Sequence, residues 1–166
     1  KLSKNEKRVA IAKDVILRIK LDKIKPYNGG FWVGFPHHYT ENKPGEGFFE
    51  YPEETPQEYI NENQCSVCAK GALMCSWVGN FNKVGWEEVD EFDEYASEGK
   101  YPQELLEIFG EEMLDNIEAA FECESFCWHY DQSETREYAN AFFEMSSLEE
   151  IMEYIITNKG EFPLPY

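Results

Sequence analysis

Hydrophobic side chains run almost without interruption from Cys65 to Phe81, in a chain that is elsewhere densely charged. Lys70 is the only charged residue in this stretch. Because a helix that is apolar on nearly all sides is usually enclosed by other elements, the pattern predicts a buried central helix over about 65–81. Small side chains recur at helical spacing and would let a neighbouring backbone pack closely: Cys65, Cys68, Ala69, Ala72, Ser76 and Gly79. The stretch is too short and too mixed to span a bilayer.

Amphipathic patterns predict further helices on both sides of this stretch. The first is expected from Ser3 to Lys25, with Ser3 and Glu6 as a capping box, Pro26 as its end and its bases on the outer face. Its apolar stripe would consist of Val9, Ala12, Ile16 and Ile19, widened by Ile11, Val15 and Leu21. Later helices are expected at about 86–96, 103–109, 111–122, 133–144 and 148–159. The apolar side of the helix at 111–122 would consist of Leu114, Ile117 and Phe121. The helix at 148–159 would begin with a capping box of Ser147 and Glu150 and bury Leu148, Ile151, Met152 and Ile155.

Residues 27–59 show neither the repeat of an amphipathic helix nor the regular alternation of a strand. Glycines and prolines alternate there with aromatic residues, which predicts an irregular insertion with one short hairpin, Gly30–Phe35 against Gly47–Tyr51. Its aromatic side chains would cover the central helix, or would form a surface for a planar ligand such as a nucleotide. The candidates for that surface are Phe31, Trp32, Phe48 and Phe49. The expected fold is a mainly α, compact single domain over residues 1–166.

The charge of the chain is unevenly distributed. The net charge is −18, but residues 1–25 hold nine of the fifteen bases and only three of the thirty-three acids. The remaining surface would repel nucleic acid and attract a basic partner, including a protein surface that normally holds nucleic acid. The alternative is that the acidity keeps an aromatic-rich protein soluble. No direct nucleic-acid binding is expected.

The cysteines permit a zinc site, but their context favours core packing. Cys65 and Cys68, together with Cys123 and Cys127, have a permissive spacing. However, the first pair begins an apolar helix and does not lie on a tight turn, so we expect reduced thiols and no metal or cofactor. A redox role for the first pair would need a strand before the helix, and the preceding EYINENQ is a poor strand. The adjacent His37 and His38 are expected to be ordinary surface residues.

Four short stretches resemble a family of small proteins encoded by bacteriophages and their hosts. They are RVAIAKDVI at 8–16, CSVCAKGAL at 65–73, IEAAFE at 117–122 and TNKGEF at 157–162. No activity is attached to that family. The resemblance implies a phage setting, in which small acidic inhibitors of host nucleic-acid enzymes and defence systems are common.

These observations lead to one main functional hypothesis and two alternatives. The main one is a non-enzymatic, cytoplasmic inhibitor of a host defence or nucleic-acid-handling protein, whose carboxylates stand in for phosphates. The alternatives are a nucleotide-binding protein that uses segment 27–59, and a metal-dependent enzyme. The candidate carboxylates are Glu87, Glu88, Asp90, Glu91, Asp93, Glu94, Glu111, Glu112, Asp115 and Glu118.

Overall fold

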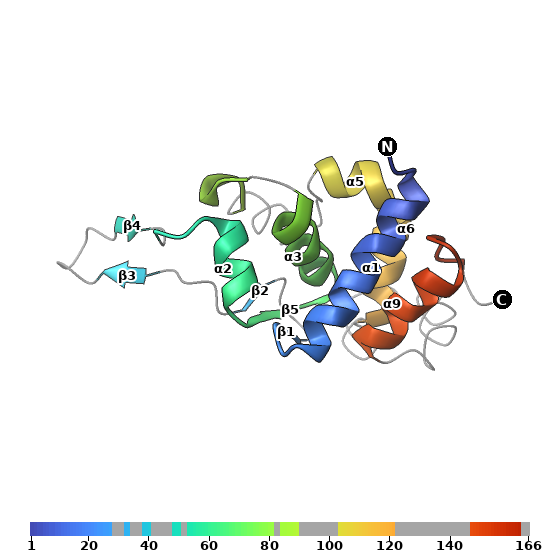
Figure 1. The fold of residues 1–166 in the computed structure, drawn as a ribbon, viewed down its shortest axis with the longest axis horizontal. Coiled ribbons are helices and arrows are strands. Elements are labelled where there is room, and N and C mark those ends of the chain that lie inside the picture. Colours follow the sequence, from blue (N-terminus) through green and yellow to red (C-terminus); the bar gives the residue numbers. More distant parts are fainter. Residues whose placement is uncertain are drawn as a thin grey trace, which may run out of the picture.

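The computed structural model describes residues 1–27, 32–33, 38–40, 48–50, 53–81, 84–89, 103–121 and 147–163. Within them the fold is mainly α, as the hydrophobic pattern predicts (Figure 1). The helices are α1 (Lys4–Lys20), α2 (Pro56–Glu62), α3 (Ala69–Phe81), α5 (Gln103–Phe109), α6 (Glu111–Phe121) and α9 (Leu148–Thr157). The strands are β1 (Ile24–Pro26), β2 (Trp32–Val33), β3 (His38–Thr40), β4 (Phe48–Glu50) and β5 (Cys65–Val67). Residues 86–89 are also helical, and the rest of the helix expected at 86–96 lies outside the described residues, as does that expected at 133–144.

Helix α3 is the buried centre of the fold, but it is shorter than the sequence predicts. Residues 69–78 are all buried, whereas Cys65–Val67 form strand β5 in place of the first helical turn. The prediction of one helix over 65–81 is therefore wrong at its start. Cys65 and Val67 are buried while Ser66 between them is partly exposed, which is the alternation of a strand. A short apolar run that leads directly into a buried helix hides this change of period.

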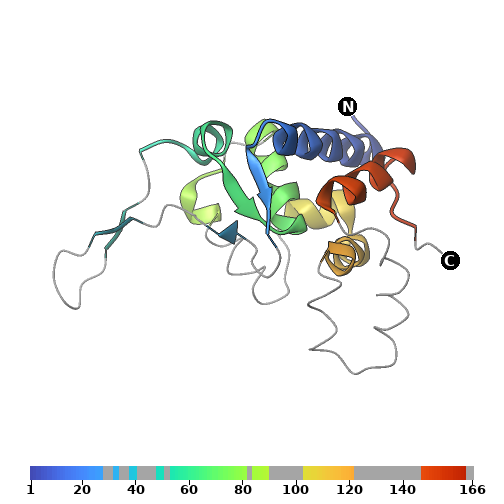
Figure 2. The ribbon, with the colours of Figure 1, turned by 90° about the horizontal axis from the view of Figure 1, so that it is seen from below.

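Helices α1, α2 and α6 pack around α3 (Figures 1 and 2). Of the predicted small side chains, Ser76 and Gly79 lie at the contact with α1, whereas Cys65 belongs to β5 and not to the helix. Ala72 is fully buried, and the Ser76 hydroxyl donates a hydrogen bond to the carbonyl of Ile11 in α1, at 3.4 Å. A Cβ atom at Gly79 would lie 2.5 Å from the Arg18 guanidinium, so the missing side chain lets α1 approach α3 closely.

Three strands pair into a small sheet with the order β1-β5-β2. β1 runs parallel to β5, with Ile24 opposite Cys65, and β2 runs antiparallel to it, with Trp32 opposite Val67. β3 and β4 form a separate antiparallel ribbon that extends away from the helices (Figure 1). The predicted pairing of Gly30–Phe35 with Gly47–Tyr51 is therefore wrong, because strand β2 in the first segment pairs with β5, and β4 in the second pairs with β3.

Helix α1 begins as predicted and ends earlier. Ser3 and Glu6 form the capping box, but the helix ends at Lys20 and not at Lys25. Asp22 adopts a left-handed conformation with φ of 57°, and the Lys23 amide donates to the Arg18 carbonyl at 2.8 Å. This is the hydrogen-bond pattern of a Schellman motif, so local capping ends the helix before Pro26 can.

The buried face of α1 matches the predicted apolar stripe in part. Ile11, Ala12 and Val15 are buried as predicted, whereas Val9, Ile16 and Ile19 are only partly buried. The prediction is wrong for Leu21, which is 61% exposed, and Leu17 is 53% exposed. Arg18 is also on the buried side of the helix, because its guanidinium contacts α2 and α3.

Helix α9 matches its prediction closely. Ser147 and Glu150 form the capping box, and the predicted apolar residues Leu148, Ile151, Met152 and Ile155 are all buried. Gly160 follows the helix with φ of 90°, and a Cβ atom there would lie 2.6 Å from the Asn5 carbonyl of α1. The left-handed residue directly after the C-cap of α9 is Lys159, with φ of 54°, whereas the missing side chain of Gly160 lets α1 pack closely against this end.

Candidate functional site

Helices α5 and α6 form a bent pair joined at Gly110. This residue has φ of 80°, a left-handed conformation that glycine adopts without strain. Leu105, Ile108, Leu114 and Ile117 are buried, so the apolar side of each helix faces the core. Because the apolar sides are buried, the charged side chains of both helices are turned outwards.

The outer side of this pair is rich in acidic residues. It has five exposed carboxylates, which we call the α5–α6 acidic face: Glu104, Glu107, Glu111, Glu112 and Asp115. No Lys or Arg occurs in residues 103–121. Glu111 and Asp115 are four residues apart, which places their backbones about 6 Å apart along the helix axis. Glu104 and Glu107 are not among the acids predicted for the surface, because α5 has only seven residues and its pattern is short.

Glu118 does not belong to this face, although the sequence placed it among the water-facing acids. It turns towards the core and pairs with Lys70 of α3 at 2.5 Å. The Lys70 side chain is only 5% exposed, so its ammonium group needs an acidic partner inside the protein. The charge interrupting the apolar stretch 65–81 could have signalled this pair, because a lysine within a buried helix requires a partner.

The second predicted acidic set lies elsewhere on the molecule. Glu87 and Glu88 are exposed in the helical segment 86–89, and α3 lies between this segment and the α5–α6 pair (Figures 1 and 2). Glu88 accepts a hydrogen bond from the Gly85 amide at 2.6 Å, so it helps to begin its own helix. The other members of this set lie outside the described residues: Asp90, Glu91, Asp93 and Glu94.

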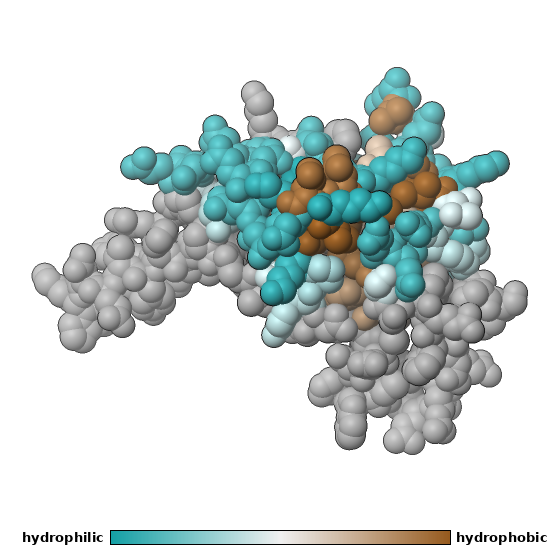
Figure 3. All heavy atoms as spheres, turned by 60° about the horizontal axis from the view of Figure 1, so that its bottom comes forward, coloured by the Kyte–Doolittle hydropathy of each residue, from teal (hydrophilic) through white to brown (hydrophobic). Residues whose placement is uncertain are grey.

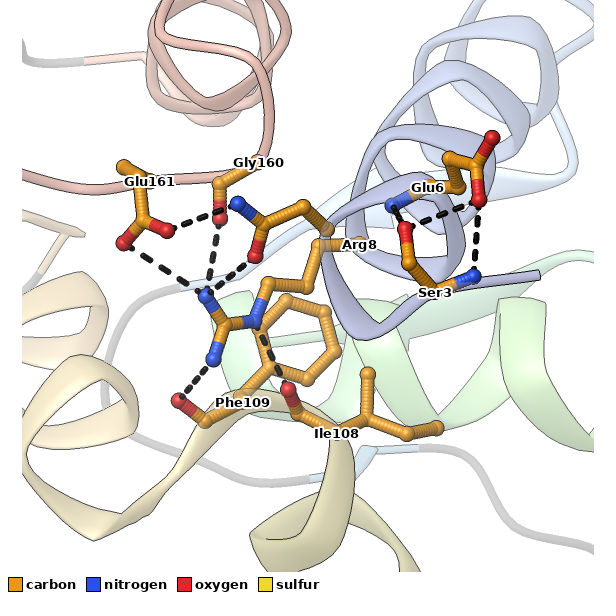
Figure 4. A network of polar contacts seen from close by, with 8 residues as sticks. Ser3, Glu6, Arg8, Ile108, Phe109, Gly160 and Glu161 are labelled. Atoms are coloured by element: carbon orange, nitrogen blue, oxygen red, sulfur yellow. Dashed lines mark hydrogen bonds and ion pairs between the residues drawn. The ribbon is translucent and has the colours of Figure 1, made fainter.

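A prominent polar cluster surrounds Arg8 of α1 (Figure 4). Its guanidinium donates to the carbonyls of Ile108 and Phe109 at the end of α5, at 2.7 and 3.2 Å, and to the carbonyl of Gly160 after α9, at 3.1 Å. Glu161 lies 3.6 Å from the same group. Arg8 thus joins the C-terminal ends of two helices to α1. Its positive charge also interacts favourably with the negative ends of the two helix dipoles.

Hydrophobic side chains also reach the surface. Figure 3 shows a group of them surrounded by hydrophilic residues on the lower side of the molecule as drawn in Figure 1. Leu17 and Leu21 lie one turn apart near the end of α1 and are more than half exposed. Folded proteins commonly expose some apolar side chains, and nothing in the described residues indicates what would cover these, so we do not assign them a site.

The cysteines of the described region form no metal centre. Cys65, Cys68 and Cys75 are free thiols and buried, and Cys123 and Cys127 lie outside the described residues. Within the part of the chain that the structure describes, no three His, Cys, Asp or Glu side chains are grouped to hold a metal ion. Burial raises the pKa of the Cys68 thiol to about 11, which keeps it protonated at neutral pH.

The aromatic candidates are divided between two sheets. Trp32 lies in β2 of the three-stranded sheet, whereas Phe48 and Phe49 lie in the separate β3–β4 ribbon. Phe31 is outside the described residues. The strand pairing therefore does not bring these aromatic positions into one sheet.

Comparisons of this chain with protein-family models, with curated proteins and with solved structures find no match. Among the helices of the described residues, none combines the length and the apolar character needed to cross a bilayer.

Proposed function

We propose that the protein is a non-enzymatic binding protein that occupies a basic, nucleic-acid-binding surface of another protein through the α5–α6 acidic face. The observation that carries this proposal is the density of exposed carboxylates on two consecutive helices without a single base between residues 103 and 121. Charges of one sign held at fixed spacing produce a strong local electric field. Such a field attracts the basic cleft of a partner protein.

The partner class follows from the chemistry of the carboxylates. A protein surface that binds nucleic acid presents Lys and Arg to a row of phosphates, and carboxylates on rigid helices can meet the same groups. The helices of this face are anchored by buried apolar residues, so the carboxylates would be presented without folding on binding. In the phage setting that the sequence resemblance implies, the partner is a host defence or nucleic-acid-handling protein, met in the cytoplasm.

The experiment is a comparison of two charge-matched variants. In the test variant, Glu104, Glu107, Glu111 and Glu112 are each changed to Gln. In the control variant, four other exposed acids are changed to Gln: Glu53, Glu54, Glu62 and Glu153. A partner is captured from host lysate, identified and purified, and its association with each variant is measured at low and physiological salt, with and without duplex DNA as competitor.

We expect the test variant to associate at least about ten times more slowly and to lose most of its salt dependence, because steering charges act chiefly on the association rate. The control variant should stay within about threefold of the unmodified protein, although its net charge is the same. If the association rate fell equally in both variants, the effect would come from the net charge alone and not from the α5–α6 acidic face. Binding that is independent of salt and unaffected by DNA would refute the proposal.

A further inference from the structure

Helices α5 and α6 cannot form one straight helix, because their apolar sides are out of register. The buried residues are Leu105, Ile108 and Phe109 in α5, and Leu114, Ile117, Ala120 and Phe121 in α6. On one continuous helix, with about 100° per residue, the centres of these two groups would lie more than a quarter of a turn apart. Only one group could then face the core, so the chain has to change direction between the helices, as Figures 1 and 2 show.

The change of direction occurs at Gly110, which belongs to the hydrogen bonding of both helices. Its amide donates to the Leu106 carbonyl at 2.9 Å, and its carbonyl accepts from the Leu114 amide at 3.1 Å. A Cβ atom at Gly110 would meet no heavy atom of the described residues within 4 Å. Packing around Gly110 itself therefore does not hold α5 in its direction.

Arg8 of α1 supplies the contact that holds this end of α5 (Figure 4). The last carbonyls of a helix have no amide partner one turn further along. Those of Ile108 and Phe109 instead accept from Arg8 Nε at 2.7 Å and from its Nη2 at 3.2 Å. The Arg8 side chain is only 13% exposed, and its Nη1 also donates to Asn5 and to the Gly160 carbonyl, both at 3.1 Å. The guanidinium is therefore itself fixed in place.

Helix α6 is held by other contacts. It packs against α3 and α9, and its Glu118 pairs with Lys70 of α3, whereas α5 packs against α1 and α6. Loss of the contacts of Arg8 would therefore release α5 and leave α6 in place.

We propose that Arg8 is a positioning residue of the α5–α6 acidic face: by holding the C-terminal end of α5 against α1, it fixes the direction of α5 relative to α6. Two carboxylates of this face lie on α5 and three on α6, so the direction of α5 sets the distances between the two groups. A partner with Lys and Arg side chains at fixed positions distinguishes one arrangement of carboxylates from another. The consequence for binding rests on the proposed function, whereas the arrangement of the helices can be measured without a partner.

The test measures that arrangement in the full-length protein. Nitroxide labels on keto amino acids at positions 103 in α5 and 116 in α6 leave the cysteines unlabelled, and double electron–electron resonance gives the distances between them. A second pair of labels, at positions 13 in α1 and 116, reports on α6 alone. The variants are Arg8→Met, Arg8→Lys and a control, Ile60→Val, which removes one methyl group from a buried side chain of α2.

Arg8→Met keeps a long side chain without donors, so we expect the 103–116 distances to shift or spread. In Arg8→Lys the change should be smaller but present, because an ammonium group cannot reproduce the fork of guanidinium donors. The 13–116 distances should not change in either variant, and neither pair should change in Ile60→Val. If the 103–116 distances stay the same in both Arg8 variants, the proposal is overturned. It is equally overturned if both pairs change together or if Ile60→Val shows the same change, because Arg8 would then act only through overall stability.

Arg8→Lys also separates the arrangement of the carboxylates from their charge, because the net charge of the protein is unchanged. Towards the partner captured as above, we expect association within about twofold of the unmodified protein and dissociation at least about threefold faster, since steering is retained but the bound carboxylates meet the partner less well. Shifted label distances without faster dissociation would overturn the positioning role in binding. The fourfold Glu→Gln variant tests the proposed function separately: if it associates normally, the proposed function fails, and the label distances still decide whether Arg8 directs α5.

Discussion

Helix α1 is mostly basic and the α5–α6 pair has only acidic charges, and the two regions use their charges differently. In α1 the two arginines point inwards: Arg8 reaches the ends of α5 and α9, and Arg18 is 7% exposed between α2 and α3. In the α5–α6 pair, five of the six carboxylates point into water, and only Glu118 is drawn to a partner in the core. The two arginines of α1 thus make polar contacts that join α1 to other helices, whereas the exposed acids of α5 and α6 form a surface.

The difference shows that the charge of a segment does not by itself indicate its role. A guanidinium with several donors can satisfy carbonyls at helix ends while its stem packs against apolar neighbours, so burial of Arg8 and Arg18 stabilises the fold. Exposed carboxylates of like charge repel one another and contribute little to stability. Our proposal therefore places partner binding on α5 and α6, whose carboxylates are exposed on the outer side of the pair.

The largest effect is expected when Arg8 of α1 is removed. In Arg8→Ala, the carbonyls of Ile108, Phe109 and Gly160 lose their donor, and α5 and α9 lose their common attachment to α1. We expect the free energy of unfolding to fall by about 3 kcal/mol, since hydrogen bonds to a charged group are strong and the carbonyls are left poorly satisfied. Urea denaturation followed by circular dichroism measures the change.

The control for Arg8 is another base on the same helix. Lys13 is exposed, and Lys13→Ala removes the same charge from α1. Its free energy of unfolding should change by less than about 0.5 kcal/mol. If both variants lose the same stability, the bases of α1 act through their overall charge, and the contrast with the acidic helices would disappear.

A smaller effect is expected at Glu118, the acid of α6 that behaves like the arginines of α1. In Glu118→Gln, the Lys70 ammonium remains buried without its carboxylate partner, which we expect to cost about 2 kcal/mol. Glu111→Gln, one exposed acid of the same helix, should change stability by less than about 0.5 kcal/mol. In a double-mutant cycle, Lys70→Met should remove most of the effect of Glu118→Gln; additive losses would show that the ion pair is not the cause.

The elements that could be predicted well from the sequence are those defined by neighbouring residues, such as a cap or an apolar repeat. Helix α9 has its capping box at Ser147 and a regular apolar repeat, and the structure confirms both its start and its buried residues. Helix α6 likewise buries the predicted Leu114, Ile117 and Phe121. A cap and a 3.6-residue repeat are properties of neighbouring residues, so they can be recognised without knowing the rest of the fold.

The features that the sequence could not supply depend on distant partners. Strand β5 exists because β1 and β2 pair with it, and nothing within Cys65–Val67 distinguishes it from a helical turn. The roles of Arg8 and Glu118 likewise depend on residues about 100 and 48 positions away, namely Ile108 and Lys70. Of the acidic site, the composition of α6 was predicted, whereas its continuation onto α5 through Gly110 required the structure.

The smallest effect concerns Glu6, an acid in basic helix α1 that supports the helix itself. The Ser3 amide donates to its carboxylate at 2.7 Å and the Ser3 hydroxyl at 2.8 Å, and the first of these hydrogen bonds is the main reason that the pKa of Glu6 is lowered. A lowered pKa in the folded state means that the ionised carboxylate stabilises the fold. This contribution is present above the unfolded pKa, near the ordinary value of 4.5, and is lost as the pH falls through the lower folded value.

The matched variants are Glu6→Gln, which keeps an acceptor at the capping-box position without a charge that titrates, and Ser3→Ala, which removes the hydroxyl donor. We expect Glu6→Gln to be slightly less stable than the unmodified protein at pH 7, and the difference to shrink as the pH falls below 4.5 and through the lowered pKa of Glu6. Urea denaturation at a series of pH values measures this difference directly, and effects common to both proteins, such as repulsion among the α5–α6 acids, cancel. A difference that stays constant from pH 7 to pH 3 would mean that the charge of Glu6 does not support α1. The acid would then belong with the surface carboxylates of α5 and α6 and not with the arginines that join α1 to the rest of the fold.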